Sequence, residues 1–164
     1  LCIVHFDAHA DLREDYLGET LSHATVMRRI HDLVGDGRIF QFGIRSGSAE
    51  EFAFAADGHV QMQPFTTDGV TDLQSAIGSR PVYLTIDLDV LDPSVFPGTG
   101  TPEAGGLSFN QLLSAVHALE PLRLVAADLV ELSPHYDTSG ISTAAALKIM
   151  RETLLVLTAD RMDL

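Results

Sequence analysis

Cysteine is almost absent from this sequence. Cys2 is the only one among 164 residues, so the chain forms no internal disulfide, and a lone reduced thiol suits a reducing compartment. No run approaches the ~20 apolar residues that a bilayer-spanning helix needs. The first residues also lack the basic start and small-residue cleavage site of a secretory signal. We therefore expect a cytoplasmic protein with no membrane contact.

Basic residues are scarce as well. The sequence has 10 Lys and Arg against 23 Asp and Glu, a formal net charge of −13. A nucleic-acid binder needs a clustered basic face to neutralise phosphates, and only Arg28 and Arg29 stand together here. The charge balance therefore argues against nucleic acid as a partner and favours a small cationic substrate.

Hydrophobic residues make up 46% of the chain, which is typical of a globular protein. A chain of this length buries about two-thirds of its unfolded surface, so the fold needs no disulfide or structural metal. The sequence contains no linker-like stretch. We therefore expect residues 1–164 to form one domain, in which a bound metal would serve chemistry.

Two kinds of apolar segment alternate along the chain. Short runs rich in β-branched and aromatic residues are typical of fully buried strands, and stretches with helical spacing lie between them. The expected strands are residues 1–6, 39–44, 82–88 and 122–130, and the expected helices are residues 24–34, 49–56, 72–77, 108–119 and 141–157. Such alternation requires crossover connections and predicts a three-layer α/β/α fold with a mainly parallel sheet.

Residues 92–106 break this alternation. They contain four glycines and three prolines, which disfavour both helix and strand. Loops of this length are usually functional or disordered, and ligands in α/β folds bind at the carboxyl ends of the strands. We therefore predict an ordered functional loop here.

Acidic side chains gather after two of the expected strands. Asp7, His9 and Asp11 follow the first strand at alternate positions, which in extended chain project to one face. Asp87 and Asp89 repeat this spacing at the end of the third strand. A lone Asp-x-His turn is more often a cap, but two carboxylate clusters at buried strand ends repel one another unless cations neutralise them. We therefore predict that these five residues are metal ligands.

The donor set indicates which metal to expect. Four carboxylates and one imidazole are too many ligands for a tetrahedral zinc site, which prefers nitrogen and sulfur. Oxygen-rich ligation suits Mg²⁺ or Mn²⁺, and the histidine favours Mn²⁺. Two divalent ions about 3.5 Å apart would use all five ligands and balance the charge of the four carboxylates.

At these residues the sequence resembles the ureohydrolases, the family of arginase and agmatinase, which hydrolyse guanidino groups at a two-manganese site. The matching stretches are residues 6–11 (FDAHAD), 85–93 (TIDLDVLDP), 97–102 (PGTGTP) and 128–134 (DLVELSP). The resemblance runs through nearly the whole chain. It implies an arginase/deacetylase-like fold, with Asp7 and Asp87 bridging the two ions.

The resemblance also implies roles for three residues outside the ligand set. Glu131 would hold the substrate guanidinium, His23 would shuttle protons, and Thr101 would bind substrate. A surface salt bridge for Glu131 and a helix-start position without catalytic role for His23 are the alternatives. Five other histidines match no motif of the family and are expected to be packing or surface residues: His5, His31, His59, His117 and His135.

One feature of the family is absent. Its remaining manganese ligand is a histidine in a Gly-Gly-Asp-His stretch upstream of the first motif, and this sequence begins with Leu1 inside an expected strand. We therefore expect a carboxyl-terminal fragment without the amino-terminal strands, in which one of two Mn²⁺ ions lacks a ligand. Members of the family commonly form trimers or hexamers, which implies a homo-oligomer.

The loop before His23 indicates a substrate. It carries Glu14, Asp15 and Glu19, lacks the asparagine of arginases, and continues in the Ser-His-x4-Arg form typical of agmatinases. Acids would repel the α-carboxylate of arginine but receive the ammonium end of agmatine. The resemblance thus implies hydrolysis of agmatine to putrescine and urea by a metal-bridging hydroxide, a step of polyamine biosynthesis. Arginine, a guanidino acid or a formimino compound as substrate, or a non-catalytic metal-binding subunit, are the alternatives.

Overall fold

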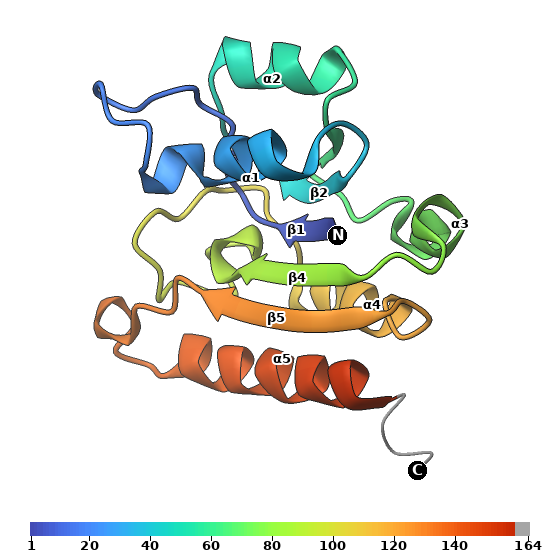
Figure 1. Cartoon of the computed structure of the whole chain (residues 1–164). Helices are drawn as coiled ribbons and strands as arrows, with labels where there is room; N and C mark the ends of the chain where they lie inside the picture. Colours follow the sequence, from blue (N-terminus) through green and yellow to red (C-terminus); the bar gives the residue numbers. More distant parts are fainter. Residues whose placement is uncertain (160–164) are drawn as a thin grey trace.

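A parallel sheet runs through the middle of the molecule (Figure 1). The structure is a computed structural model and describes residues 1–159. The strands are β1 (Cys2–Phe6), β2 (Ile39–Ile44), β3 (Gln61–Pro64), β4 (Val82–Asp87) and β5 (Leu124–Val130), and they lie in the order β3-β2-β1-β4-β5. Each neighbouring pair is parallel, as predicted.

Helices connect the strands in the predicted alternation. They are α1 (Val26–Val34), α2 (Ala49–Ala56), α3 (Leu73–Ile77), α4 (Phe109–Ala118) and α5 (Ile141–Thr158), with 3-10 turns η1 (His23–Thr25), η2 (Val70–Asp72), η3 (Leu88–Val90) and η4 (Pro134–Tyr136). All the predicted strands and helices are present, with ends that differ by up to two residues. Residues 92–106 contain no helix or strand, so the predicted loop is confirmed.

The helices cover both faces of the sheet and complete the three layers. On one face, Val4 packs in a buried cluster with Leu112 of α4 and Ile149 of α5. On the other face, Ile3 packs in a second buried cluster with Met27 of α1. Successive residues of β1 therefore point into different cores, which explains why this strand is apolar except for the buried His5.

Two strands differ from the prediction. β3 was not predicted, because its sequence QMQP has no apolar run, and it forms an edge of the sheet where it is largely exposed. β5 was predicted to be fully buried, but its residues are half-buried or exposed. The reason is its place at the opposite edge, where Asp128 accepts hydrogen bonds from Tyr83 and Thr85 on one face and Leu129 packs against the core on the other.

The strand order brings the predicted site residues together. The chain passes from β1 to β2 on one side, whereas β4 lies on the other side of β1, so the carboxyl ends of β1 and β4 meet where the strand order switches. Phe6 is in register with Ile86, and Asp87 is in register with Val130. The residues that follow β1 and β5 therefore lie beside the end of β4. Within residues 1–159, no helix is long and apolar enough to cross a membrane.

Candidate metal centre

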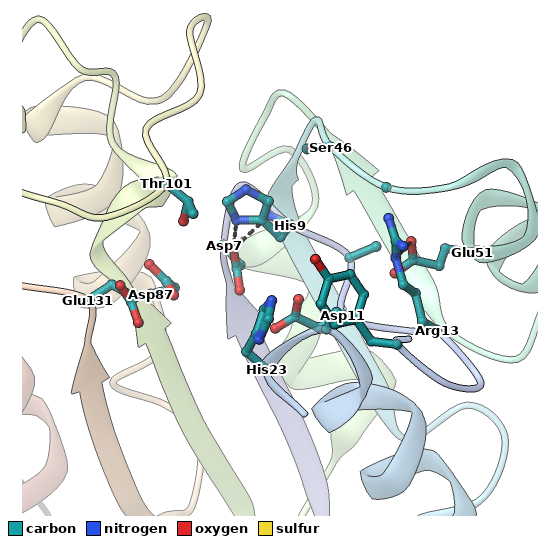
Figure 2. Close-up of a pocket in the computed structure, with 14 residues that line it drawn as sticks. Asp7, His9, Asp11, Arg13, His23, Ser46, Glu51, Asp87, Thr101 and Glu131 are labelled. Atoms are coloured by element: carbon teal, nitrogen blue, oxygen red, sulfur yellow. Dashed lines mark hydrogen bonds and ion pairs between the residues drawn. The ribbon is translucent and has the colours of Figure 1, made fainter. Parts of the chain in front are cut away.

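A cavity of about 570 Å³ opens at the carboxyl ends of β1, β4 and β5 (Figure 2). Among the residues that line it are seven of the predicted site residues: Asp7, His9, Asp11, His23, Asp87, Thr101 and Glu131. Asp89 is buried behind this lining, with 1% of its surface exposed. The strand order thus brings the site residues predicted from the sequence together at one cavity.

The first carboxylate group converges by a turn. β1 ends at Phe6, and a bend at Ala8 interrupts the extended geometry expected for the three ligands, although His9 still pairs in parallel with Ser46. The Asp7 carboxylate accepts a 2.6 Å hydrogen bond from the backbone N–H of His9, and Asp11 has a left-handed backbone with φ of 54°. The Asp11 carbonyl accepts the backbone N–H of Met27 at the start of α1, which holds this conformation.

The second carboxylate group also uses a turn. β4 ends at Asp87, and Asp89 lies in η3, so these two side chains do not share one strand face as predicted. The Asp87 carboxylate accepts the backbone N–H of Asp89 at 2.9 Å. The Asp89 carboxylate accepts the backbone N–H of Ala8 and the hydroxyl of Thr101, each at 3.2 Å. Asp89 thereby joins β4, the turn after β1 and the loop of residues 92–106.

The donor atoms form two groups that share one aspartate. Ligand atoms of Asp7, His9 and Asp89 lie within 4.8 Å of one another, and so do those of Asp7, Asp11 and His5. A shared carboxylate is what two adjacent cations need as a bridge. Asp87 faces the same space from β4, although it belongs to neither group (Figure 2).

The buried carboxylates lie close enough together to repel one another unless positive charge neutralises them. Burial, with the charges of Asp7 and Asp89, raises the pKa of Asp87 to about 10, and burial with Asp7 raises the pKa of Asp11 to about 7. Hydrogen bonds to Asp7 and Asp89 raise the pKa of His9 to about 11. Protons or cations must therefore neutralise the cluster. Oxygen-rich donors with one imidazole fit divalent ions of the Mn²⁺ type.

His5 belongs to this centre, although the sequence indicated only a packing or surface role. It is buried, and its Nε2 lies 2.8 Å from Oδ2 of Asp7. Gln41 fixes the ring, because its amide nitrogen lies 3.0 Å from His5 Nδ1 and 2.8 Å from the Ala10 carbonyl. The alternate spacing of His5 and Asp7 along the strand was the signal that could have revealed this contact. His5 therefore orients Asp7.

Glu131 and His23 face the cavity from different sides (Figure 2). Glu131 directly follows β5 in a left-handed conformation with φ of 66°, and it makes no ion pair with any residue in 1–159. This argues against a surface salt bridge as its role. His23 opens η1 and packs edge-on against Tyr16, with ring centroids 5.0 Å apart. The position of His23 agrees both with a role in proton transfer and with a helix-start position that has no catalytic role.

The acidic residues of the loop before His23 do not line the cavity, where they would have to lie to receive the ammonium end of agmatine. Glu14 lies 2.5 Å from Arg28, Asp15 accepts a backbone N–H in its own turn, and neither they nor Glu19 reach the lining. Arg13 lines the cavity instead. The acids of this loop therefore give no support for the ammonium end of a substrate.

The model of the arginase family matches residues 1–156 of the sequence. The chain belongs to the arginase family. Among relatives in this family, the chain is 47% identical over 158 residues to an agmatinase of Halalkalibacterium halodurans, covering 94% of this chain and 55% of that protein. It is 35% identical over 170 residues to a guanidinobutyrase of Pseudomonas aeruginosa, covering 94% and 52%.

A solved structure within the arginase family matches the fold closely. A candidate agmatinase from Clostridium difficile superposes with a TM-score of 0.93 at 49% identity, over 97% of this chain and 59% of that one. The chain thus spans about half the length of the curated relatives it matches.

Arg45 ties the parts of this arginase-family site together. It follows β2, and its guanidinium donates to backbone carbonyls of three separate segments: Gly43 in β2, Asp89, Val90 and Leu91 after β4, and Glu103 in the loop of residues 92–106. The shortest of these bonds, 2.7 Å long, reaches the carbonyl of Asp89. Arg45 therefore holds the turn that carries a predicted ligand.

Replacing Arg45 with methionine should lower the free energy of unfolding by about 2 kcal/mol, because several partly buried carbonyls lose their donor. Urea denaturation measures this. Arg123 is exposed, so the matched variant Arg123→Met should change stability by less than about 0.5 kcal/mol. Equal stability of the two variants would contradict the role assigned to Arg45.

Proposed function

We propose that this chain takes part in the hydrolysis of a guanidino group, with agmatine as substrate and two Mn²⁺ ions as cofactor. One observation carries the proposal: Asp7, Asp87 and Glu131 follow or end three neighbouring strands and line one cavity. A clustered anionic wall can bind cations, and a separate carboxylate can bind a planar guanidinium.

The metal ligands would be the five residues that the sequence marked. Asp7, His9 and Asp89 would hold a cation at one group of donors, Asp7 and Asp11 would do so at the other, and Asp87 would add a carboxylate from β4. Bound divalent ions supply Lewis acidity and a nucleophile at neutral pH. The sixth ligand of the family pattern does not occur in this sequence.

The protein residues would bind the substrate and move a proton. The carboxylate of Glu131 can accept two parallel N–H bonds from a guanidinium, which orients the plane of that group in the cavity. In the balanced reaction, water adds to the guanidinium carbon, the C–N bond to the alkyl amine breaks, and a proton passes to the leaving nitrogen. His23 would carry that proton, which is supported by its position in the cavity lining.

Agmatine is favoured by the agmatinase name of the relative at 47% identity and by the Ser-His-x4-Arg form around His23. A guanidino acid is the second candidate, because Arg13 lines the cavity and could pair with a carboxylate. A relative named guanidinobutyrase, at 35% identity, supports that candidate. Cytoplasmic location, one domain and a homo-oligomer stay predictions.

Urea release from agmatine, 4-guanidinobutyrate and arginine distinguishes these candidates. With added Mn²⁺, we expect the purified protein to turn over agmatine with a kcat/KM at least about tenfold above the other two, a difference of about 1.4 kcal/mol in transition-state binding. Bound metal is counted on the same sample. Faster turnover of 4-guanidinobutyrate would make the guanidino acid the substrate, and metal binding without any turnover would favour a non-catalytic subunit.

A further inference from the structure

Two histidines and an aspartate meet far from the cavity, at the amino end of the sheet. His31 lies in the last turn of α1, Asp36 lies between α1 and β2, and His59 lies between α2 and β3. The strands that follow begin at Ile39 and Gln61. Because the sheet is parallel, the cluster of His31, Asp36 and His59 occupies the end opposite the carboxylate centre.

Their donor atoms already converge. Oδ1 of Asp36 lies 2.8 Å from Nε2 of His31 and 2.8 Å from Nδ1 of His59, and the three donor atoms all lie within 4.8 Å of one another. The His31 side chain is 15% exposed and the His59 side chain 37%. Solvent therefore reaches the cluster, so water can complete a coordination shell.

The two rings are held in place by contacts of their own. His59 stacks on Phe54 with ring centroids 4.2 Å apart, and His31 meets the same ring edge-on at 4.9 Å. The backbone N–H of Gly35 donates to the carbonyl of His31 at 2.8 Å, and that of Gly37 donates to the carbonyl of His59. Because these contacts fix the imidazoles, less order has to be imposed when a ligand binds.

We propose that His31, Asp36 and His59 form a second metal site, which takes Zn²⁺ or a similar borderline transition-metal ion. Two imidazoles, one carboxylate and water are the donors that zinc accepts in a tetrahedral site with an open position. Zinc bonds of about 2.1 Å imply donor separations of about 3.4 Å, so each imidazole nitrogen needs to move away from the Asp36 oxygen, which lies 2.8 Å from both, by only about 0.6 Å. The site differs in donor type from the oxygen-rich centre at the other end of the sheet.

A bound ion would link three segments. It would join the end of α1 to the turns that precede β2 and β3. The chain's net charge of −13 also raises the local concentration of cations around the exposed Asp36. The proposal does not depend on the proposed hydrolysis, because none of its residues lines the cavity.

Zinc counting by equilibrium dialysis of the full chain tests the site. We expect Asp36→Asn and His59→Gln each to bind one zinc fewer per chain than the wild type, whatever amount the carboxylate centre takes. His117→Gln is the matched control, because His117 pairs with a single carboxylate, that of Glu152. It should bind as much zinc as the wild type. Equal counts in all four proteins would overturn the proposal.

Imidazole ¹⁵N spectra of the wild type give a second readout that needs no variant. Addition of Zn²⁺ should shift Nε2 of His31 and Nδ1 of His59, the two nitrogens that face Asp36. The His117 resonances should stay in place. If neither nitrogen of the cluster shifts at millimolar zinc, Asp36 serves only as a hydrogen-bond acceptor for the two rings and the metal site does not exist.

Discussion

Asp87→Ala is expected to lose both manganese retention and urea release. Asp87 ends β4 between the turn after β1 and the residue that follows β5, and its carboxylate faces the shared donor Asp7 across the cavity (Figure 2). Removing this carboxylate takes away the only predicted bridging ligand from β4. Loss of several kcal/mol of metal-derived stabilisation corresponds to a fall in kcat of at least about a thousandfold.

The measurement combines metal counting with the urea assay on the same protein sample. Without metal, burial and the charges of Asp7 and Asp89 hold the pKa of Asp87 at about 10, so folding at neutral pH has to protonate this carboxyl group. Its removal takes that cost away and should leave the unfolding midpoint unchanged or higher. The control is Asp128→Ala, which removes a carboxylate from β5 that bonds to Tyr83 and Thr85 and does not line this cavity. Full activity with two ions in Asp87→Ala would refute the ligand assignment.

The apolar runs predicted most of the fold because the inner strands are buried on both faces. β1, β2 and β4 therefore are largely hydrophobic in sequence, and this pattern predicts crossover helices between them. β3 could not be predicted, because an exposed edge strand needs few apolar side chains and Met62 alone makes no hydrophobic run. For β5 the sequence revealed the strand but not its exposure, which depends on its place at the edge of the sheet.

The residues of the candidate site were predictable, but their geometry was not. Spacing alone suggested extended chain for Asp7, His9 and Asp11, whereas the ligands converge through turns closed by side-chain to backbone hydrogen bonds. The bonds that close these turns are local, but the convergence of the two groups depends on contacts distant in sequence, as when Ala8 donates to Asp89. The same dependence explains why the role of Arg45 emerged only from the structure, since most of its partners lie 44 or more residues away in sequence. His5 contacts Asp7 two residues away, but Gln41, which fixes its ring, is also distant in sequence.

Pairing with distant partners also explains why the acidic residues of the loop before His23 do not line the cavity. Its acids read as part of a cationic substrate site, but Glu14 is held by Arg28 and Arg29 outside the cavity. Arg13 and Tyr16 of this loop line the cavity, and Arg13, the charged one, has the opposite charge. The numbers of acidic and basic residues in a loop therefore predict the sign of its net charge, but not which of its side chains line the cavity.

Glu131→Gln is expected to lower kcat/KM for agmatine by about a hundredfold while both metal ions stay bound. The substitution keeps the size of the side chain and its position after β5, but it replaces a charged acceptor of two N–H bonds by a neutral amide with one acceptor oxygen. A charged hydrogen bond contributes about 1.5–3 kcal/mol, which sets the scale of the loss.

The partition of this loss between kcat and KM tests what Glu131 does. A carboxylate that grips the guanidinium equally in the ground state and the transition state would raise KM and leave kcat unchanged, whereas one that stabilises the tetrahedral centre would lower kcat. The control Glu120→Gln changes an exposed acid outside the cavity and should leave both constants unchanged. Wild-type kinetics in Glu131→Gln would show that this carboxylate does not bind the substrate, and loss of metal would instead assign it to the metal centre.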